Sequence, residues 1–332
     1  MIDLSGNVVD LLGDRIFEGR VRIEAGRIAK IVRMGDENPD LDYLCPGLVD
    51  AHVHVESSLL VPSEFARLAA PHGTVATVSD PHEIANVLGI DGVEYMIENG
   101  DRVPFKFFFG APSCVPATPF ETAGAELGVE AVTELLERPH IRYLSEMMNV
   151  PGAANRDEEV MAKITAARER GKPVDGHAPG VRGETLEAYV EAGISTDHES
   201  FTEAEAREKL DLGLKIAIRE GSAARNFDEL AGLIEAYPDR CMLCTDDMHP
   251  DRLAEGHIDA LVRRGIARGI APLTMLRCAS LHPIEHYDLP VGLLQEGDSA
   301  DLVVVDGIAD PEAFRVKRTY VNGTCVAENG EP

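Results

Sequence analysis

The chain has 332 residues, of which 44% are apolar and 27% charged, values that suit a globular protein with one large and one smaller domain. Its net charge of −27 argues against nucleic acids and anionic membranes as partners, because both would repel it. No apolar run reaches the roughly 18 residues that cross a bilayer, and the first residues lack the basic start of a signal peptide. We therefore expect a cytoplasmic protein.

The charged residues are skewed, because only seven of the 31 basic residues are lysine. An acidic surface with little lysine suits a salt-rich cytoplasm, where screening weakens self-repulsion, so we predict a halophilic source. An acidic enzyme from an ordinary cytoplasm is the alternative. The six cysteines fit reduced, mostly buried thiols. Cys241 and Cys244 have CxxC spacing, but no second pair completes a zinc site.

Both ends of the chain show the two-residue alternation of β-strands. It predicts strands over residues 8–12 and 19–28 near the start, and over 300–306 and 319–323 near the end. We predict that residues 1–45 and 288–332 join in one small β-sandwich domain.

Between these ends, short apolar runs alternate with segments of helical periodicity, such as residues 183–191 and 203–210. Eight such strands separated by helices predict an α/β fold, a (β/α)8 TIM-type barrel over residues 46–287. The predicted strands are residues 48–54, 74–79, 106–109, 141–146, 173–177, 194–198, 214–218 and 241–246.

Metal-binding side chains end several of these strands. The carboxyl ends of the strands converge on one mouth of such a barrel, where active sites lie, so these side chains should meet. His52 and His54 are two residues apart and face the same side of a strand. A carboxylate such as Glu146 can bridge two cations. The sequence thus predicts a site for two divalent cations, of Mn, Fe or Zn, with the ligands His52, His54, Glu146, His177, His198 and Asp246.

A family resemblance follows from these motifs. The segment from Pro46 to Ser58, with Asp50-x-His52-x-His54 followed by Glu56-Ser57-Ser58, resembles the first metal motif of adenine deaminases in the amidohydrolase superfamily. Further similar segments follow in the family's order: residues 80–87, 113–117, 146–148, 175–180, 197–200, 219–226, 244–247 and 255–259. Together they form a specific signal, whereas each alone would be weak.

The resemblance implies a barrel with a β-sandwich from both termini, a binuclear centre of Mn or Fe held by the same six ligands, and hydrolysis of adenine to hypoxanthine and ammonia. Two cations would lower the pKa of a bound water toward about 7, which gives hydroxide at neutral pH. Asp246 would act as general base and then acid. Family members usually carry a further C-terminal domain of some two hundred residues, whereas this chain stops at Pro332.

Several other polar residues are candidates for contacts to the substrate. Glu220 is the candidate for protonating a ring nitrogen of adenine, and a salt bridge to Arg219 or Arg225 is an equally good interpretation. The remaining substrate-binding candidates, which could equally be capping or solvated residues, are His82, Glu83, Glu199, Ser200, Asp247, His249 and His257.

Two other functions are compatible with the sequence. The first is a related amidohydrolase acting on another purine or a cyclic amide. Enzymes of the dihydropyrimidinase type usually bridge their metals with a carbamylated lysine on the fourth strand, where this chain has Glu146. The second is a non-catalytic barrel, which would have little reason to keep all six ligands. We also expect a homo-oligomer, because superfamily members are often dimers or larger.

Overall fold

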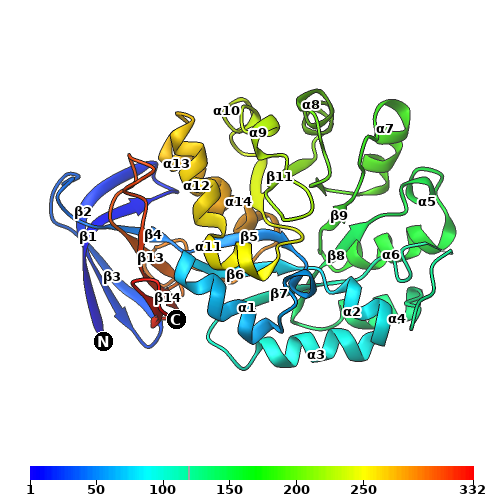
Figure 1. Ribbon diagram of the computed structural model, residues 1–332, viewed down its shortest axis with the longest axis horizontal. Coiled ribbons are helices and arrows are strands. Elements are labelled where there is room, and N and C mark those ends of the chain that lie inside the picture. Colours follow the sequence, from blue (N-terminus) through cyan, green and yellow to red (C-terminus); the bar gives the residue numbers. More distant parts are fainter. Residues whose placement is uncertain (119) are drawn as a thin grey trace.

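The computed structural model describes residues 1–118 and 120–332. Both ends of the chain meet in one seven-stranded mixed sheet with the order β15-β14-β13-β4-β1-β2-β3, at one end of the molecule (Figure 1). Strand β4 runs parallel to β1 and antiparallel to β13, and so joins the two ends. The strands are β1 (Ile2–Asp10), β2 (Arg15–Glu24), β3 (Arg27–Arg33), β4 (Tyr43–Pro46), β13 (Leu302–Val305), β14 (Val316–Val321) and β15 (Thr324–Glu328).

One strand prediction in this sheet was wrong. Residues 19–28 were expected to form a single strand, but the chain reverses at Ala25 and Gly26, and β2 pairs antiparallel with β3. Both turn residues have positive φ, 49° and 79°, which is the conformation that tight hairpin turns require. Ile23 pairs with Ile28 across the turn and both are buried, so the apolar alternation continues through the reversal and hides it.

The described residues in the middle of the chain form eight parallel strands, at the eight places predicted. They form a five-stranded sheet, β5-β6-β7-β8-β9, and a three-stranded sheet, β10-β11-β12. The strands are β5 (Leu48–Val53), β6 (Thr74–Ser79), β7 (Lys106–Ala111), β8 (Ile141–Met147), β9 (Val174–Gly176), β10 (Thr196–Asp197), β11 (Lys215–Arg219) and β12 (Cys241–Cys244).

Backbone hydrogen bonds link both pairs of neighbouring edges of these two sheets. Ser195 N donates to Val174 O over 2.8 Å, which connects β10 to β9. Asp246 N donates to His52 O over 2.9 Å, and His54 N donates to Asp246 O over 3.2 Å, which connects the end of β12 to β5. The carboxyl ends of all eight strands therefore lie on one side of the molecule.

Helices follow each of the parallel strands and lie outside them (Figure 1). The helices predicted at residues 183–191 and 203–210 are confirmed as α7 and α8. The α-helices are α1 (Pro62–Ala69), α2 (His82–Leu88), α3 (Ile90–Gly100), α4 (Val129–Leu136), α5 (Val150–Ala154), α6 (Glu158–Glu169), α7 (Gly183–Ala192), α8 (Glu203–Asp211), α9 (Phe227–Leu230), α10 (Leu233–Ala236), α11 (Pro250–Glu255), α12 (Ile258–Ala267), α13 (Pro272–Leu276) and α14 (His282–His286). Two 3-10 turns, η1 (Val55–Ser58) and η2 (Ala70–His72), and a π-helical turn, η3 (Arg277–Leu281), complete the elements.

Burial explains why the parallel strands read as nearly continuous apolar runs. Every residue of β5, β6 and β12 is buried, because helices cover the outside of the strands and side chains fill the inside. The polar exceptions concentrate at the carboxyl ends. Among the described residues, no helix combines the length and the apolar character needed to span a bilayer.

Candidate metal centre

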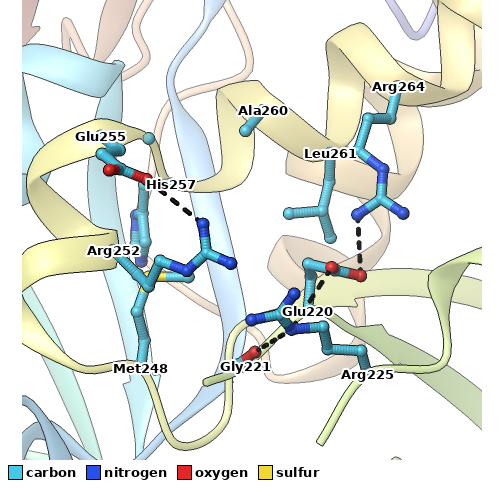
Figure 2. A pocket seen from close by; sticks show the side chains of 11 residues that line it. Glu220, Gly221, Arg225, Met248, Arg252, Glu255, His257, Ala260, Leu261 and Arg264 are labelled. Atoms are coloured by element: carbon cyan, nitrogen blue, oxygen red, sulfur yellow. Dashed lines mark hydrogen bonds and ion pairs between the residues drawn. The ribbon is translucent and has the colours of Figure 1, made fainter.

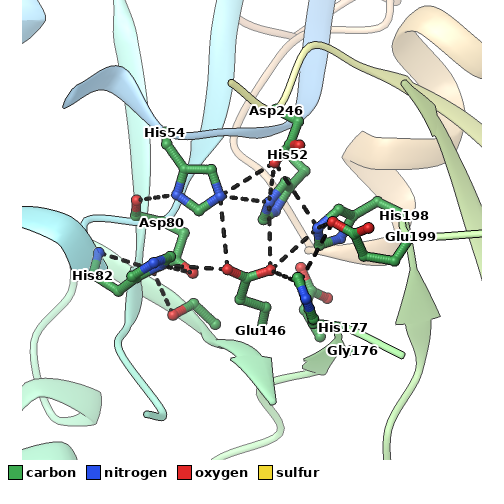
Figure 3. Close-up of polar contacts among 12 residues, drawn as sticks. His52, His54, Asp80, His82, Glu146, Gly176, His177, His198, Glu199 and Asp246 are labelled. Atoms are coloured by element: carbon green, nitrogen blue, oxygen red, sulfur yellow. Dashed lines mark hydrogen bonds and ion pairs between the residues drawn. The ribbon is translucent and has the colours of Figure 1, made fainter. Parts of the chain in front are cut away.

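The structure brings the six predicted metal ligands together at the carboxyl ends of five strands (Figure 3). His52 lies in β5 and His54 directly follows it, and their two-residue spacing turns both imidazoles to the same side. The other four ligands lie in or just after β8, β9, β10 and β12, and are Glu146, His177, His198 and Asp246.

One group of ligands gathers around Asp246. The Nε2 atoms of His52 and His54 lie 3.1 Å from each other, and 3.4 and 3.3 Å from Asp246 Oδ1. Two imidazole nitrogens and one carboxylate oxygen therefore point at a common space. This arrangement can hold one divalent cation.

Glu146 lies between this group and a second one (Figure 3). Its Oε1 is 3.7 Å from His54 Nε2, and its Oε2 is 2.8 Å from His177 Nδ1 and 3.1 Å from His198 Nε2. The two oxygens of one carboxylate thus face different imidazole groups, as a bridging ligand requires.

The electrostatics of the cluster fit cation binding. Burial alone would raise the pKa of the Glu146 carboxyl, but the hydrogen bond with His177 and the close approach of His198 hold it well below its usual range. Burial likewise opposes ionisation of Asp246, but hydrogen bonds with His52 and His54 keep its pKa low. Burial lowers the pKa of His198, and the nearby His52 lowers it further. For His52, His54 and His177, burial lowers the pKa, but the neighbouring carboxylates outweigh it and raise the pKa, so a metal ion would displace protons from these imidazoles.

The donor chemistry of the site also fits a metal. His198 Nε2 is buried and faces Glu146, yet makes no hydrogen bond to any residue that the structure describes. His52 Nδ1 is buried without a hydrogen-bond partner within the same described ranges. Imidazole nitrogen with carboxylate oxygen suits Zn, Mn or Fe. A set of buried histidines and carboxylates is therefore available to a divalent cation.

Asp80, which the sequence analysis did not single out, organises the side of the cluster next to β6. It follows β6, and its carboxylate accepts hydrogen bonds from Ser145 Oγ over 2.7 Å and from His82 N over 3.1 Å. His82 Nδ1 lies 3.2 Å from Asp80 Oδ2 and 3.4 Å from Glu146 Oε1. Burial lowers the pKa of His82, but Asp80 outweighs it and raises the pKa to about 10. Glu83 Oε2 lies 3.2 Å from His54 Nδ1.

Two of the candidate substrate contacts are fully buried. His257 is fully buried, with Nδ1 2.6 Å from Thr74 Oγ1 and Nε2 3.0 Å from Asp50 Oδ2. Asp50 in turn accepts hydrogen bonds from Thr245 and from His52 N. Ser200 is also fully buried and donates to Asp197 over 2.8 Å. Both positions suit support of the strand ends.

Asp247 and His249 lie in the loop that joins β12 to α11, beyond the ligand Asp246. Asp247 accepts a hydrogen bond from Ser57 Oγ over 2.5 Å, and Asp247 forms a further small group with His54 and Glu83. His249 is exposed at the start of α11, where its backbone N donates to Ser222 Oγ.

Glu220 lies in a separate pocket of about 250 Å³ at the end of β11 (Figure 2). Its carboxylate is 2.8 Å from Arg264 Nη1 and 3.8 Å from Arg225 Nε. Of the two arginines that the sequence suggested, Arg225 is therefore a partner of Glu220 and Arg219 is not. The closer partner, Arg264, was not predicted. Because side chains alternate along a strand, Glu220 and the preceding Arg219 point to opposite sides.

Arg219 is the residue that points into the metal centre. Its Nη1 lies 2.5 Å from both Asp246 Oδ2 and Glu199 Oε1, and its Nη2 lies 2.8 Å from Glu199 Oε2. Glu199 also approaches His177 and His198, at 3.6 and 3.5 Å. Side chains alternate along β11, so the sequence pattern could have identified Arg219, the last residue of this strand, as one that faces inward.

Comparison with known proteins decides the family. Residues 43–326 match the amidohydrolase family. The chain belongs to the amidohydrolase family. This amidohydrolase is 60% identical over 328 residues to a protein of Salinibacter ruber named adenine deaminase, a match that covers 99% of this chain and 59% of that protein. A protein of the same name from Sulfurovum sp. is 55% identical over 331 residues, which is 100% of this chain and 61% of that protein. This amidohydrolase thus spans about three fifths of the length of these relatives.

Solved structures support the amidohydrolase fold. N-acetyl-D-glucosamine-6-phosphate deacetylase from Mycobacterium smegmatis superimposes with a TM-score of 0.70 at 18% identity, covering 98% of this chain and 100% of that one. N-isopropylammelide isopropylaminohydrolase from Burkholderia multivorans gives a TM-score of 0.68 at 17% identity and covers all of both chains. At these identities, the likeness concerns the fold alone.

Proposed function

We propose that this protein hydrolyses adenine to hypoxanthine and ammonia. The observation that carries the proposal is the high identity, along almost the whole chain, to relatives named adenine deaminase. Water attacks C6 of the purine: a C6–O bond forms, the C6–N bond to the amino group breaks, and the nitrogen leaves as ammonia. One hydrogen of the water ends on the departing nitrogen and the other on a ring nitrogen.

We further propose that the six ligands hold two divalent cations, of Mn or Fe, with Glu146 between them. Glu146 supports this by presenting its two oxygens to different imidazoles. When bound, the cations would lower the pKa of a water molecule toward about 7 and so supply a nucleophile.

The chain itself would handle the protons. Asp246 Oδ1 faces the cluster, and we assign it the proton of the attacking water, which it then passes to the departing amine. His82, Glu83, Glu199 and Asp247 are proposed to surround the purine. His249 would contribute from the outer loop, whereas the buried His257 and Ser200 would act indirectly by supporting the strand ends. Glu220 remains the proposed donor to a ring nitrogen, although its pairing with Arg264 must break for that contact.

The alternative is a related amidohydrolase acting on another purine or on a cyclic amide. The ligand cluster would serve such a substrate equally well. Glu146 in β8, where enzymes with a carbamylated lysine would need lysine, favours the deaminase.

An ammonia-release assay tests the proposal. Protein loaded with Mn²⁺ in high salt is given adenine, adenosine and a panel of cyclic amides. We expect ammonia from adenine, and its loss in Asp246→Asn but not in the control Asp91→Asn, an exposed residue in α3. Turnover of another compound without turnover of adenine would reject the substrate and keep the family.

We also infer the domain architecture, the cellular location and the oligomeric state of the protein. The linked sheet edges support a closed (β/α)8 barrel over residues 46–287, and the shared core of β1, β2, β13 and β14 supports a β-sandwich from residues 1–45 and 288–332. A cytoplasmic homo-oligomer is the setting that we propose, and sedimentation of the purified protein would test the oligomeric state.

A further inference from the structure

We propose that Arg219 is a positioning residue that turns one oxygen of Asp246 into the metal centre and holds the other away from it. The inference about metal affinity concerns the ligand cluster alone, and its kinetic part rests on the proposed deamination. Arg219 ends β11, and its side chain is only 3% exposed, between the loops that follow β10 and β12.

The contacts of Arg219 form a fork that only a guanidinium can make. Both terminal nitrogens bond to Glu199, and Nη1 is shared with Asp246 Oδ2 at 2.5 Å. An arginine presents its donors in one rigid plane, whereas a lysine offers one compact ammonium. The fork therefore fixes Asp246 relative to Glu199, which comes from a different strand end.

The contact with Arg219 determines which carboxylate oxygen of Asp246 faces the metal centre. With Oδ2 held by Arg219, Oδ1 is left facing His52 Nε2 and His54 Nε2 at 3.4 and 3.3 Å. Asp246 also has a φ of 54°, a left-handed conformation that is uncommon outside glycine and costs free energy. A residue in a strained backbone needs external restraints, and Arg219 supplies one at the carboxylate.

The backbone around Arg219 is held independently of its side chain. Asn226 Oδ1 accepts from Arg219 N over 2.8 Å, and Asn226 Nδ2 donates to the carbonyls of His198 and Ser200 at 3.2 and 3.0 Å. Removing the guanidinium should therefore leave the end of β11 in place. The expected effect is on the orientation of Asp246.

The test compares Arg219→Met with wild type by Mn²⁺ titration and by steady-state kinetics with adenine. We expect the Mn²⁺ affinity to fall by about 10- to 100-fold, the usual effect of losing a residue that orients a ligand. We expect kcat to fall by about 100-fold with little change in KM, because a misplaced catalytic group affects the reacting state more than binding. Added guanidinium should partly restore kcat in Arg219→Ala, and methylammonium should not.

Arg277→Met is the matched control, because Arg277 donates to Leu11 O and pairs with Asp14, away from the ligand cluster. It should keep wild-type Mn²⁺ affinity. If Arg219→Met does not fold, Arg219→Lys is measured in its place, with the same loss expected. Wild-type Mn²⁺ affinity and kcat in a folded Arg219 variant would overturn the inference. If wild type releases no ammonia from adenine, the proposed function fails, but the Mn²⁺ titration still decides the role of Arg219.

Discussion

Lys209 Nζ lies 2.9 Å from Asp197 Oδ2, and neither side chain is exposed to solvent. Lys209 also donates to Ala178 O over 2.7 Å and pairs with Glu205 at 2.8 Å. Ala178 and Asp197 adjoin two of the proposed metal ligands. One buried cation therefore ties helix α8 to two strand ends of the metal centre.

Replacing Lys209 by methionine should leave two buried carboxylates without a cation. We expect the free energy of unfolding to fall by about 3–5 kcal/mol, the usual effect of breaking a buried ion pair from one side. Urea unfolding of the metal-free protein measures it. The control Lys30→Met, at an exposed position in β3, should change it by no more than about 0.5 kcal/mol. A loss below about 1 kcal/mol in Lys209→Met would contradict the expectation.

Metal binding should stabilise the fold through the same ligands. A cation that binds only the folded state adds about 2.7 kcal/mol at 100 times its Kd. We expect Mn²⁺ to raise the urea midpoint of wild type and of His140→Gln, which changes an exposed histidine. His198→Gln should lose most of this increase, because His198 belongs to the buried cluster. An equal increase in all three proteins would place the bound metal elsewhere.

Glu220 allows a direct comparison with its neighbour Arg219. Its partners Arg225 and Arg264 are part-exposed, so the ion pairs should contribute only about 0–1 kcal/mol to stability. Because Glu220 is the proposed donor to a ring nitrogen, we expect Glu220→Gln to lower kcat/KM by about 100-fold or more while stability changes little. A loss of less than about 10-fold would instead indicate that Glu220 serves only as the ion-pair partner of Arg264.

Stability should also decline in acid because of His286. Burial and the nearby Lys215 cation lower the pKa of His286 from 6.5 to about 3. Between these two values the unfolded chain binds the proton and the folded chain does not, so stability falls as the pH falls through this window. Relative to wild type, His286→Gln should lose about 2 kcal/mol less between pH 7 and pH 5. The control His140→Gln should follow wild type, and identical pH profiles for all three would contradict the assignment.

The net charge of −27 leads to a salt prediction. At about 1 M salt the screening length is only about 3 Å, so repulsion between surface carboxylates is largely removed. We expect a higher melting temperature in molar KCl than in dilute buffer. Equal or greater stability in dilute buffer would count against a halophilic origin.

The ligand cluster could be predicted because its residues share one local feature. Each lies at or just beyond the end of an apolar strand, and parallel strands bring their carboxyl ends together. Asp80 also directly follows an apolar strand, but the sequence gives no reason to prefer it over His82, which lies two residues later. Arg219 and Lys209 are harder to find, because their importance lies in partners from other strand ends, and a single sequence does not reveal which residues pair.

The terminal sheet was predicted less completely for a different reason. Strands β4 and β15 are short, and β3 is mostly exposed, so none has a strong apolar alternation. Their positions are set by pairing: β4 lies between β1 and β13, and β15 lies beyond β14. Which strands pair depends on contacts formed in the complete sheet, and these contacts are not visible in the local sequence of each strand.

The central place of β4 in that sheet has a consequence for biosynthesis. Pro46 pairs with Leu302, so the ribosome must add roughly 250 residues before the partner strand exists, which takes about 13 to 50 s at about 5–20 residues per second. During that interval the nascent chain presents an unpaired β edge to its surroundings. Recombinant yield should therefore depend on growth temperature and on chaperone supply, and a chain cut before residue 302 should aggregate.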